Sequence, residues 1–219
     1  MTTDVQRALA DLVDAGAVAP GTQPGEVVDL VVSHARSLDG LDGFTRLETL
    51  SLLSCEVGDY APVASLPALR VLAVENSDVV DLAWIEKLEL YVAVLRRNRI
   101  RDATAVIGLA GLQVLDLSGN PLDARSRAAA RALAGPVVTL DDDELTDVNV
   151  MLADAGVPLV GYRVGDGVWS CATGLTLTSH PEAGHVVTSV GDLAAVARGE
   201  RSPADLLGLA ADPHGGTHE

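Results

Sequence analysis

A chain of 219 residues with 48% hydrophobic residues holds enough apolar material for one domain with additions, or for two small domains. Its formal net charge of −16 repels phosphate backbones and anionic lipid, so nucleic acid and membrane surfaces are not expected partners, whereas a basic protein is compatible. Two isolated cysteines, Cys55 and Cys171, do not form a disulfide framework, which favours a reduced, cytoplasmic protein.

The amino terminus predicts a helix and no targeting segment. The stretch "MTTDVQRALADLVDAG" carries acidic residues where a signal peptide is basic. Apolar runs fall short of the roughly 18 residues that suggest a membrane span. Thr2 or Thr3 is a suitable N-cap, and Gly16 can end the helix. Its apolar face comprises Val5, Leu9, Leu12 and Val13. We expect this face to cover the first unit of the repeat that follows.

A hydrophobic repeat begins after this helix. Apolar residues recur at the first, fourth, sixth and eleventh places of successive segments, whose starts lie about 22 residues apart. The segments are "GEVVDLVVSHA" from Gly25, "LETLSLLSCEV" from Leu47, "LRVLAVENSDV" from Leu69, "LYVAVLRRNRI" from Leu90 and "LQVLDLSGNPL" from Leu112. The alternation predicts short strands. Between them, an apolar residue at every third position predicts 3₁₀ or short helical turns.

This pattern resembles the leucine-rich repeat family, specifically its class with repeats of about 22 residues that occurs in a regulatory subunit of type-1 protein phosphatase. The resemblance covers about residues 25–145. It implies an α/β solenoid with parallel strands on the concave face and 3₁₀ or short helical turns on the convex face. The segment "RAAARALAGPVVTLDDDEL" is similar to the helix, strand and acidic turn that cap such solenoids, with Val137 and Leu140 in the capping strand.

The chain therefore divides into four predicted parts. Residues 1–24 form an N-terminal capping helix, and residues 25–146 form the solenoid with its C-terminal cap. Residues 147–211 lose the period and predict a small α+β appendage, with strands joined by the turn Gly165-Asp166-Gly167. Two short helices follow, the second capped by Ser202 with Pro203 in its first turn. Residues 212–219 are predicted to be a disordered tail.

The stretch "VLRRNRIRD" (94–102) concentrates arginines in an acidic chain. The repeat places Ile100 in the core. The resemblance implies that Asn98, like Asn120, occupies the place where this repeat class has an inward-turned asparagine, with Ser33, Cys55 and Ser77 as substitutes in the other repeats. Neighbouring strands lie about 4.8 Å apart. This spacing predicts Arg96 beside Glu75 and Ser118, Arg99 beside Asp78, and Arg101 near Asp123. The arginines thus form either a solvated charge ladder or a docking site for an acidic peptide. The lack of an aromatic platform argues against nucleic acid.

The concave face offers a surface for a partner. Its third column is predicted to read Val27, Thr49, Val71, Val92 and Val114, and its fifth Asp29, Ser51, Ala73, Val94 and Asp116. Strand propensity alone also favours exposed valines. Tyr91 is the best anchor because exposed aromatic residues contribute strongly to interfaces. The predicted partner-binding residues are Val71, Ala73, Glu75, Tyr91, Val92, Val94, Arg96, Arg97, Val114 and Asp116.

Catalytic and metal-binding signals are weak. His180 and His185 flank Glu182, but no third ligand accompanies them at a known spacing, so we predict no metal. The run "DDDE" (141–144) lacks the spaced ligands of a calcium loop and predicts a solvated acidic turn. We predict neither catalytic residues nor a cofactor.

The expected function is a non-catalytic protein–protein interaction module, an adaptor or regulator that binds a protein or peptide through its concave face. One alternative is an immunity-type inhibitor whose acidic surface covers a basic toxin or enzyme. Another is a catalytic or metal-dependent appendage. We expect a monomeric bacterial protein, since almost all basic residues are arginine, as in GC-rich genomes.

Overall fold

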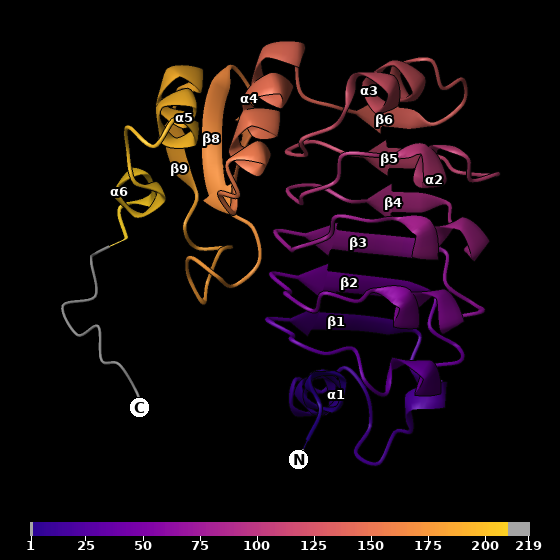
Figure 1. Ribbon diagram of the computed structural model, residues 1–219. Coiled ribbons are helices and arrows are strands. Elements are labelled where there is room, and N and C mark those ends of the chain that lie inside the picture. Colours follow the sequence, from indigo (N-terminus) through magenta and orange to yellow (C-terminus); the bar gives the residue numbers. More distant parts are fainter. Residues whose placement is uncertain (1, 210–219) are drawn as a thin grey trace.

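The computed structural model describes residues 2–209 and contains a six-stranded parallel sheet whose strands follow one another in chain order. The strands are β1 (Asp29–Ser33), β2 (Thr49–Leu53), β3 (Val71–Glu75), β4 (Val92–Val94), β5 (Val114–Asp116) and β6 (Val137–Thr139). Figure 1 shows them stacked from the N-terminal end upward. Each strand buries alternate residues, as the xLxL pattern predicts, except that β6 is more open at its edge.

Short turns carry the chain from each strand to the next. Between β1 and β5 they are the 3₁₀ helices η2 (Leu41–Gly43), η3 (Ala61–Ser65) and η4 (Ala83–Lys87) and the α-helix α2 (Thr104–Ile107), while a further 3₁₀ helix, η1 (Pro24–Glu26), precedes β1. Each of η3, η4 and α2 buries one apolar residue of the predicted stripe, Val63, Ile85 and Val106. The chain therefore has the strand-and-turn architecture of a leucine-rich repeat.

The first repeat is displaced from the predicted register. Asp29 pairs with Thr49 and Leu30 with Leu50, so the repeat starts at Val27, which is buried, and not at Gly25. Consequently Asp29 and Val31 occupy the third and fifth columns, where Val27 and Asp29 were expected. Ala35 takes the inward place expected for Ser33. The prediction failed because it assumed equal spacing, whereas this repeat is shorter than the next.

The helix α1 (Asp4–Asp14) covers the open end of β1. Thr3 is its N-cap, with a reciprocal hydrogen bond to Gln6, and Gly16 follows the C-cap in a left-handed conformation. Val5 and Ala8 belong to the same hydrophobic core as the repeats. Asp4 accepts hydrogen bonds from the backbone amides of Arg36 and Ser37.

The far end of the repeats leads directly into the appendage. Helix α3 (Ala124–Arg131) precedes β6, which contains Val137 but ends before Leu140. The run "DDDE" is not a solvated turn, because Asp142 caps helix α4 (Asp143–Asp154) and Asp141 is buried. Helix α4 crosses the boundary expected at 146/147, and Leu145 packs in the second core.

The appendage is a small α+β unit with its own core. An antiparallel sheet of β7 (Leu159–Val164), β8 (Gly167–Ala172) and β9 (Val186–Thr188) packs with α4, α5 (Val190–Ala197) and α6 (Pro203–Leu207). Gly165 and Asp166 turn the hairpin, and Ser202 caps α6, as predicted. The core contains Leu145, Val148, Leu152, Leu159, Ala172, Leu193, Val196, Leu206 and Leu207. The predicted tail, 212–219, lies outside the described residues.

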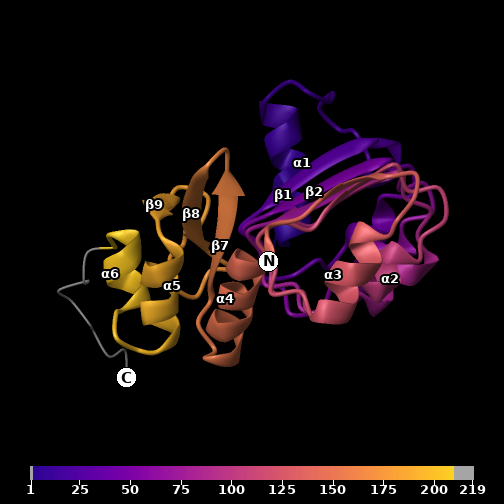
Figure 2. The same cartoon turned by 90° about the horizontal axis from the view of Figure 1, so that it is seen from above.

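The appendage lies on the side of the sheet toward which the strand arrowheads point (Figure 1). Its helices and sheet stand level with the later strands, and the loop between β8 and β9 reaches down toward β1 and β2, where Glu182 contacts His34 and Ser54. Figure 2 shows from above that α4, α5 and α6 lie beside the repeats, away from α2 and α3. Within residues 2–209, none of the helices is long and apolar enough to cross a membrane.

Candidate functional site

The strands align four valines across the sheet in one row. The parallel register pairs Val71 with Val92, Val92 with Val114, and Val114 with Val137. We call these four residues the valine row. Ala73 and Val94 lie in register two places further along β3 and β4. Tyr91 precedes Val92 and is 50% exposed, while Val137 at the edge is 68% exposed. The four valines extend the predicted concave surface by one strand.

The charged residues at the ends of these strands pair with one another. The Glu75 carboxylate accepts hydrogen bonds from Arg96 Nε and Arg97 Nη2, each at 2.6 Å. The pair of Arg96 with Glu75 confirms the lateral contact predicted from strand spacing. Asp116 accepts hydrogen bonds from the amide and hydroxyl of Ser118. The arginines at this edge are therefore partly satisfied within the chain.

Arg99 and Arg101 lie beside the residues predicted for them, but the side chains of three arginines make other contacts than expected. Arg97 is only 13% exposed and turns toward the appendage, so it does not belong to the open concave surface. Asp78 accepts from the Tyr60 hydroxyl and the Gly58 amide, and within the described chain Arg99 forms no ion pair with it. Arg101 pairs with Asp154 of α4.

Asp123 lies next to Arg101 as predicted, and its amide donates to the Arg101 carbonyl at 2.9 Å, but its side chain caps α3 and does not pair with the guanidinium. The repeat spacing predicts where the arginines lie on the sheet. It does not predict the ion pair of Arg101, because Asp154 comes from helix α4 outside the repeats.

A column of left-handed residues follows the strands and contacts the appendage. The eighth residue of each repeat, His34, Ser54, Asn76, Arg97 or Gly119, has a φ angle between 53° and 70°. A Cβ atom on Gly119 would lie 2.9 Å from Arg97 Cγ, so this last position needs glycine. Left-handed backbone is rare in residues other than glycine, asparagine and aspartate. We call these five residues the edge column.

The edge column and the appendage enclose a cavity of about 500 Å³. Its lining includes Ser54, Glu75, Asn76, Arg97 and His185. The Arg97 guanidinium lies over the Tyr162 ring, 5.2 Å from its centroid. Asn76 donates a hydrogen bond to His185 Nε2 at 3.2 Å. With Nε2 as an acceptor, His185 Nδ1 carries the ring proton and donates a hydrogen bond to the Tyr162 hydroxyl oxygen. We call this space the junction cavity.

Burial makes the two thiols inert. Desolvation raises the pKa of Cys171 to about 12, and that of Cys55 to about 11. The Cys171 sulfur accepts a hydrogen bond from Asn76, and Cys55 lies in the inward column of the repeats. Neither thiol forms a thiolate near neutral pH, so neither is equipped to act as a nucleophile.

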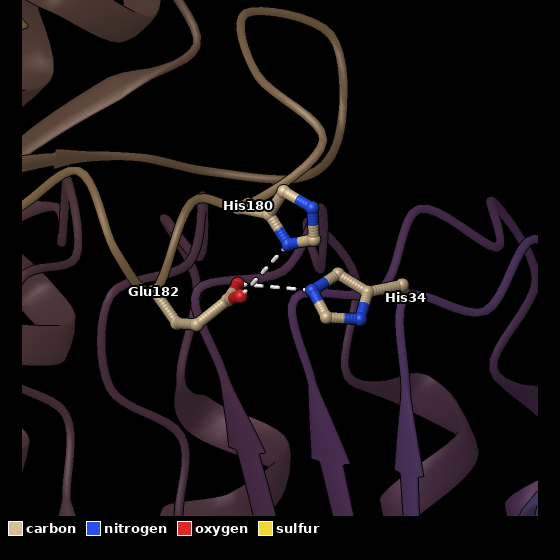
Figure 3. Close-up of side chains that lie close together, drawn as sticks. All are labelled: His34, His180 and Glu182. Atoms are coloured by element: carbon tan, nitrogen blue, oxygen red, sulfur yellow. Dashed lines mark hydrogen bonds and ion pairs between the residues drawn. The ribbon is translucent and has the colours of Figure 1, made fainter.

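A second cluster lies at the rim of the junction cavity and joins the two parts of the chain (Figure 3). Glu182 Oε2 lies 3.0 Å from His34 Nε2, and Glu182 Oε1 lies 3.2 Å from His180 Nδ1. Ser54 Oγ also donates to Glu182 Oε2 at 2.9 Å. Although desolvation raises the pKa of Glu182, these hydrogen bonds and one from its own backbone lower it to about 2.

Sequence reasoning paired the wrong histidines. It grouped His180 with His185 around Glu182, but His185 bonds to Asn76 and Tyr162 while His34 completes the cluster. His34 belongs to the first repeat, far away in sequence. The available signal was its place in the repeat, because the eighth residues of all repeats lie along one edge of the sheet.

Comparisons with known proteins return only solved structures. No family model and no curated protein matches this chain. Internalin C2 from Listeria monocytogenes is 24% identical over 52% of this chain and 52% of its own, with a TM-score of 0.46. Internalin F from the same organism is 17% identical over 69% of this chain and 63% of its own, with a TM-score of 0.32.

This chain thus spans about half the length of the first of these structures. Its assignment as a leucine-rich-repeat architecture rests on its own strand register and buried repeat pattern.

Proposed function

We propose that this chain is a non-catalytic protein-binding module, an adaptor or regulator in the cytoplasm, that holds a partner through the valine row. The observation that carries the proposal is the continuous apolar strip from Val71 to Val137, with Ala73, Val94 and Tyr91 beside it. Apolar patches rimmed by charged groups mark protein interaction sites. Here Glu75, Arg96 and Asp116 supply the charged rim.

Strand propensity explains valines on a pleated surface without any partner. It does not explain Tyr91, which precedes β4 and exposes half of an aromatic side chain. A tyrosine buries a large area at a low cost in conformational entropy, which suits it as an anchor. The partner surface expected here is apolar at its centre and polar at its margin.

The test is affinity capture from native lysate with the wild-type chain and the double variant Tyr91→Ala/Val137→Asp. Both substitutions change exposed side chains, so the fold should survive, and circular dichroism checks this. The matched control is Val164→Ala/Val187→Asp, which alters two exposed residues of the appendage. We expect one stoichiometric protein that the valine-row variant loses and the control retains. Equal capture by all three chains would contradict the proposal.

A second candidate function is inhibition of a basic protein by an acidic surface. The charge of −16 favours it, as does a cleft of about 310 Å³ whose carboxylates outnumber its one arginine. The cleft is lined by Glu56, Asp59, Asp78, Asp81, Arg99 and the stacked rings of Tyr60 and Trp84. Aromatic rings and carboxylates together attract cationic side chains. Capture that disappears with moderate salt, yet survives in the valine-row variant, would favour this function.

A further inference from the structure

The cluster at the rim of the junction cavity has the composition of a transition-metal site. Two imidazole nitrogens and one carboxylate, from His34, His180 and Glu182, offer ligand atoms that all lie within 4.8 Å of one another. Zinc binds imidazole and carboxylate at about 2.0–2.2 Å, which places two ligands of a tetrahedral ion about 3.3–3.5 Å apart. The distances from Glu182 oxygens to the two histidines, 3.0 and 3.2 Å, are close to this spacing.

We propose that His34, His180 and Glu182 bind a divalent transition metal ion, best represented by Zn²⁺, that ties the appendage to the first repeat. Mixed imidazole and carboxylate ligands suit zinc and similar ions better than magnesium or calcium, which prefer oxygen alone. Three protein ligands leave a fourth position for water. The proposal concerns binding and needs no catalytic activity.

The groups around the cluster hold two of its ligands in position. The His34 amide donates to the Leu53 carbonyl at 3.0 Å, which holds the left-handed backbone that presents the ring. Ser54 Oγ donates to the Glu182 carboxylate and orients it. Outer hydrogen bonds of this kind fix the ligands of metal sites.

The cluster is open to an ion from solvent. The side chains of His34, Glu182 and His180 are 35%, 46% and 66% exposed. The net charge of −16 raises the local concentration of cations around the chain. Binding would replace the hydrogen bonds of Glu182 to His34 and to His180 with coordination bonds, and it would therefore tie the appendage to the first repeat.

The experiment is calorimetric titration of the chelator-treated full chain with Zn²⁺. We expect one ion per chain, a rise in the melting temperature that a chelator reverses, and visible absorption bands when Co²⁺ is used in place of Zn²⁺. His34→Ala, His180→Ala and Glu182→Gln should each lower zinc affinity by more than the 10–100-fold that loss of an outer hydrogen-bond partner costs. Melting of the metal-free variants verifies that each is folded.

The matched control is His214→Ala/His218→Ala, which removes the other pair of histidines that could bind zinc, both outside the described residues. We expect this variant to bind zinc like the wild type. Failure of the full chain to bind one ion would overturn the proposal. So would loss of binding in the control alone, because the ion would then be held by the tail. If the cluster variants bind as well as the wild type, the three side chains form only hydrogen bonds.

Discussion

At the scale of single residues, the inward column is the ninth residue of each repeat, which is Ala35, Cys55, Ser77, Asn98 or Asn120. Polar side chains in this column make hydrogen bonds to backbone groups that have no partner in the turn. Asn98 Nδ2 donates to the carbonyls of Val74 and Leu95, and its Oδ1 accepts from the Ser77 amide. One repeat later, Asn120 Nδ2 donates in the same way to the carbonyls of Leu95 and Leu117, while its Oδ1 accepts from the Ile100 amide. The equivalent places hold Ser77, Cys55 and finally Ala35, so the column loses polar atoms toward the N-terminal end.

Asn98→Ala should therefore destabilise the fold strongly. The substitution leaves buried backbone groups without partners, at about 1–3 kcal/mol for each group, so we expect the free energy of unfolding to fall by at least about 3 kcal/mol. Urea denaturation measures this loss. Cys55→Ala is the matched control in the same column, since its thiol makes only weak hydrogen bonds, and should cost far less. Equal losses would show that packing and not hydrogen bonding sets the stability here.

At the scale of elements, helix α4 joins the two parts of the chain. Asp142 caps its first turn by accepting a hydrogen bond from the Leu145 amide at 2.9 Å. Its carboxylate also accepts a hydrogen bond from Arg163 Nε of β7. The bond from the Leu145 amide is the main reason that the pKa of Asp142 lies below its usual value. Further along the helix, Asn149 bonds to both the amide and the carbonyl of Gly161. These contacts bind α4 to the appendage sheet.

Asp142→Ala should lower the stability of the appendage by about 1–2 kcal/mol, the usual cost of a lost helix cap. The measurement is hydrogen exchange of the α4 and β7 amides, which reports local opening. Asp143→Ala is the matched control, because this neighbouring carboxylate pairs with Arg131 at the surface and should matter much less. Faster exchange in the control than in Asp142→Ala would contradict the assigned role of the cap.

The same scale explains which elements were predictable. Alternating apolar residues predicted β2 to β5, and Thr3 and Ser202 predicted the two helix starts, because both signals depend only on near neighbours. The first repeat was placed two residues early because Gly25 and Val27 both precede an alternating apolar stretch, and only pairing of Asp29 with Thr49 separates the two registers. The acidic run at 141–144 favours a turn by composition, but Asp142 and the acidic residues after it cap and begin α4.

At the scale of the whole molecule, the appendage docks on the edge column and makes part of its stability depend on pH. Burial, and then the nearby Arg97 charge, lowers the pKa of His185 below 6.5. The unfolded chain therefore binds the proton more tightly than the folded chain. The stability that neutral His185 contributes is fully present above about pH 6.5, the unfolded value, and is lost as the pH falls from there through the lower pKa of the folded chain.

His185→Gln should remove part of this pH dependence. Urea unfolding of the wild type and the variant, both with a chelator, is compared at about pH 7.5 and about pH 5.5, on either side of the ordinary histidine pKa. We expect the wild type to lose more stability than the variant between the two pH values. An identical loss in both chains would show that His185 does not couple docking to pH.

Side-chain periodicity predicts the repeat, strands β2 to β5, their inward residues and most of the valines, because the chain stacks on itself. The register of the first strand depended on its pairing with β2. The extension of the valine row to Val137 and the partners of Arg97 and Arg101 depended on contacts between distant segments. The cluster of His34 with His180 and Glu182 also depends on a contact between distant segments. Only the tertiary structure decided it, since docking an appendage on a repeat edge leaves no periodic mark in the sequence.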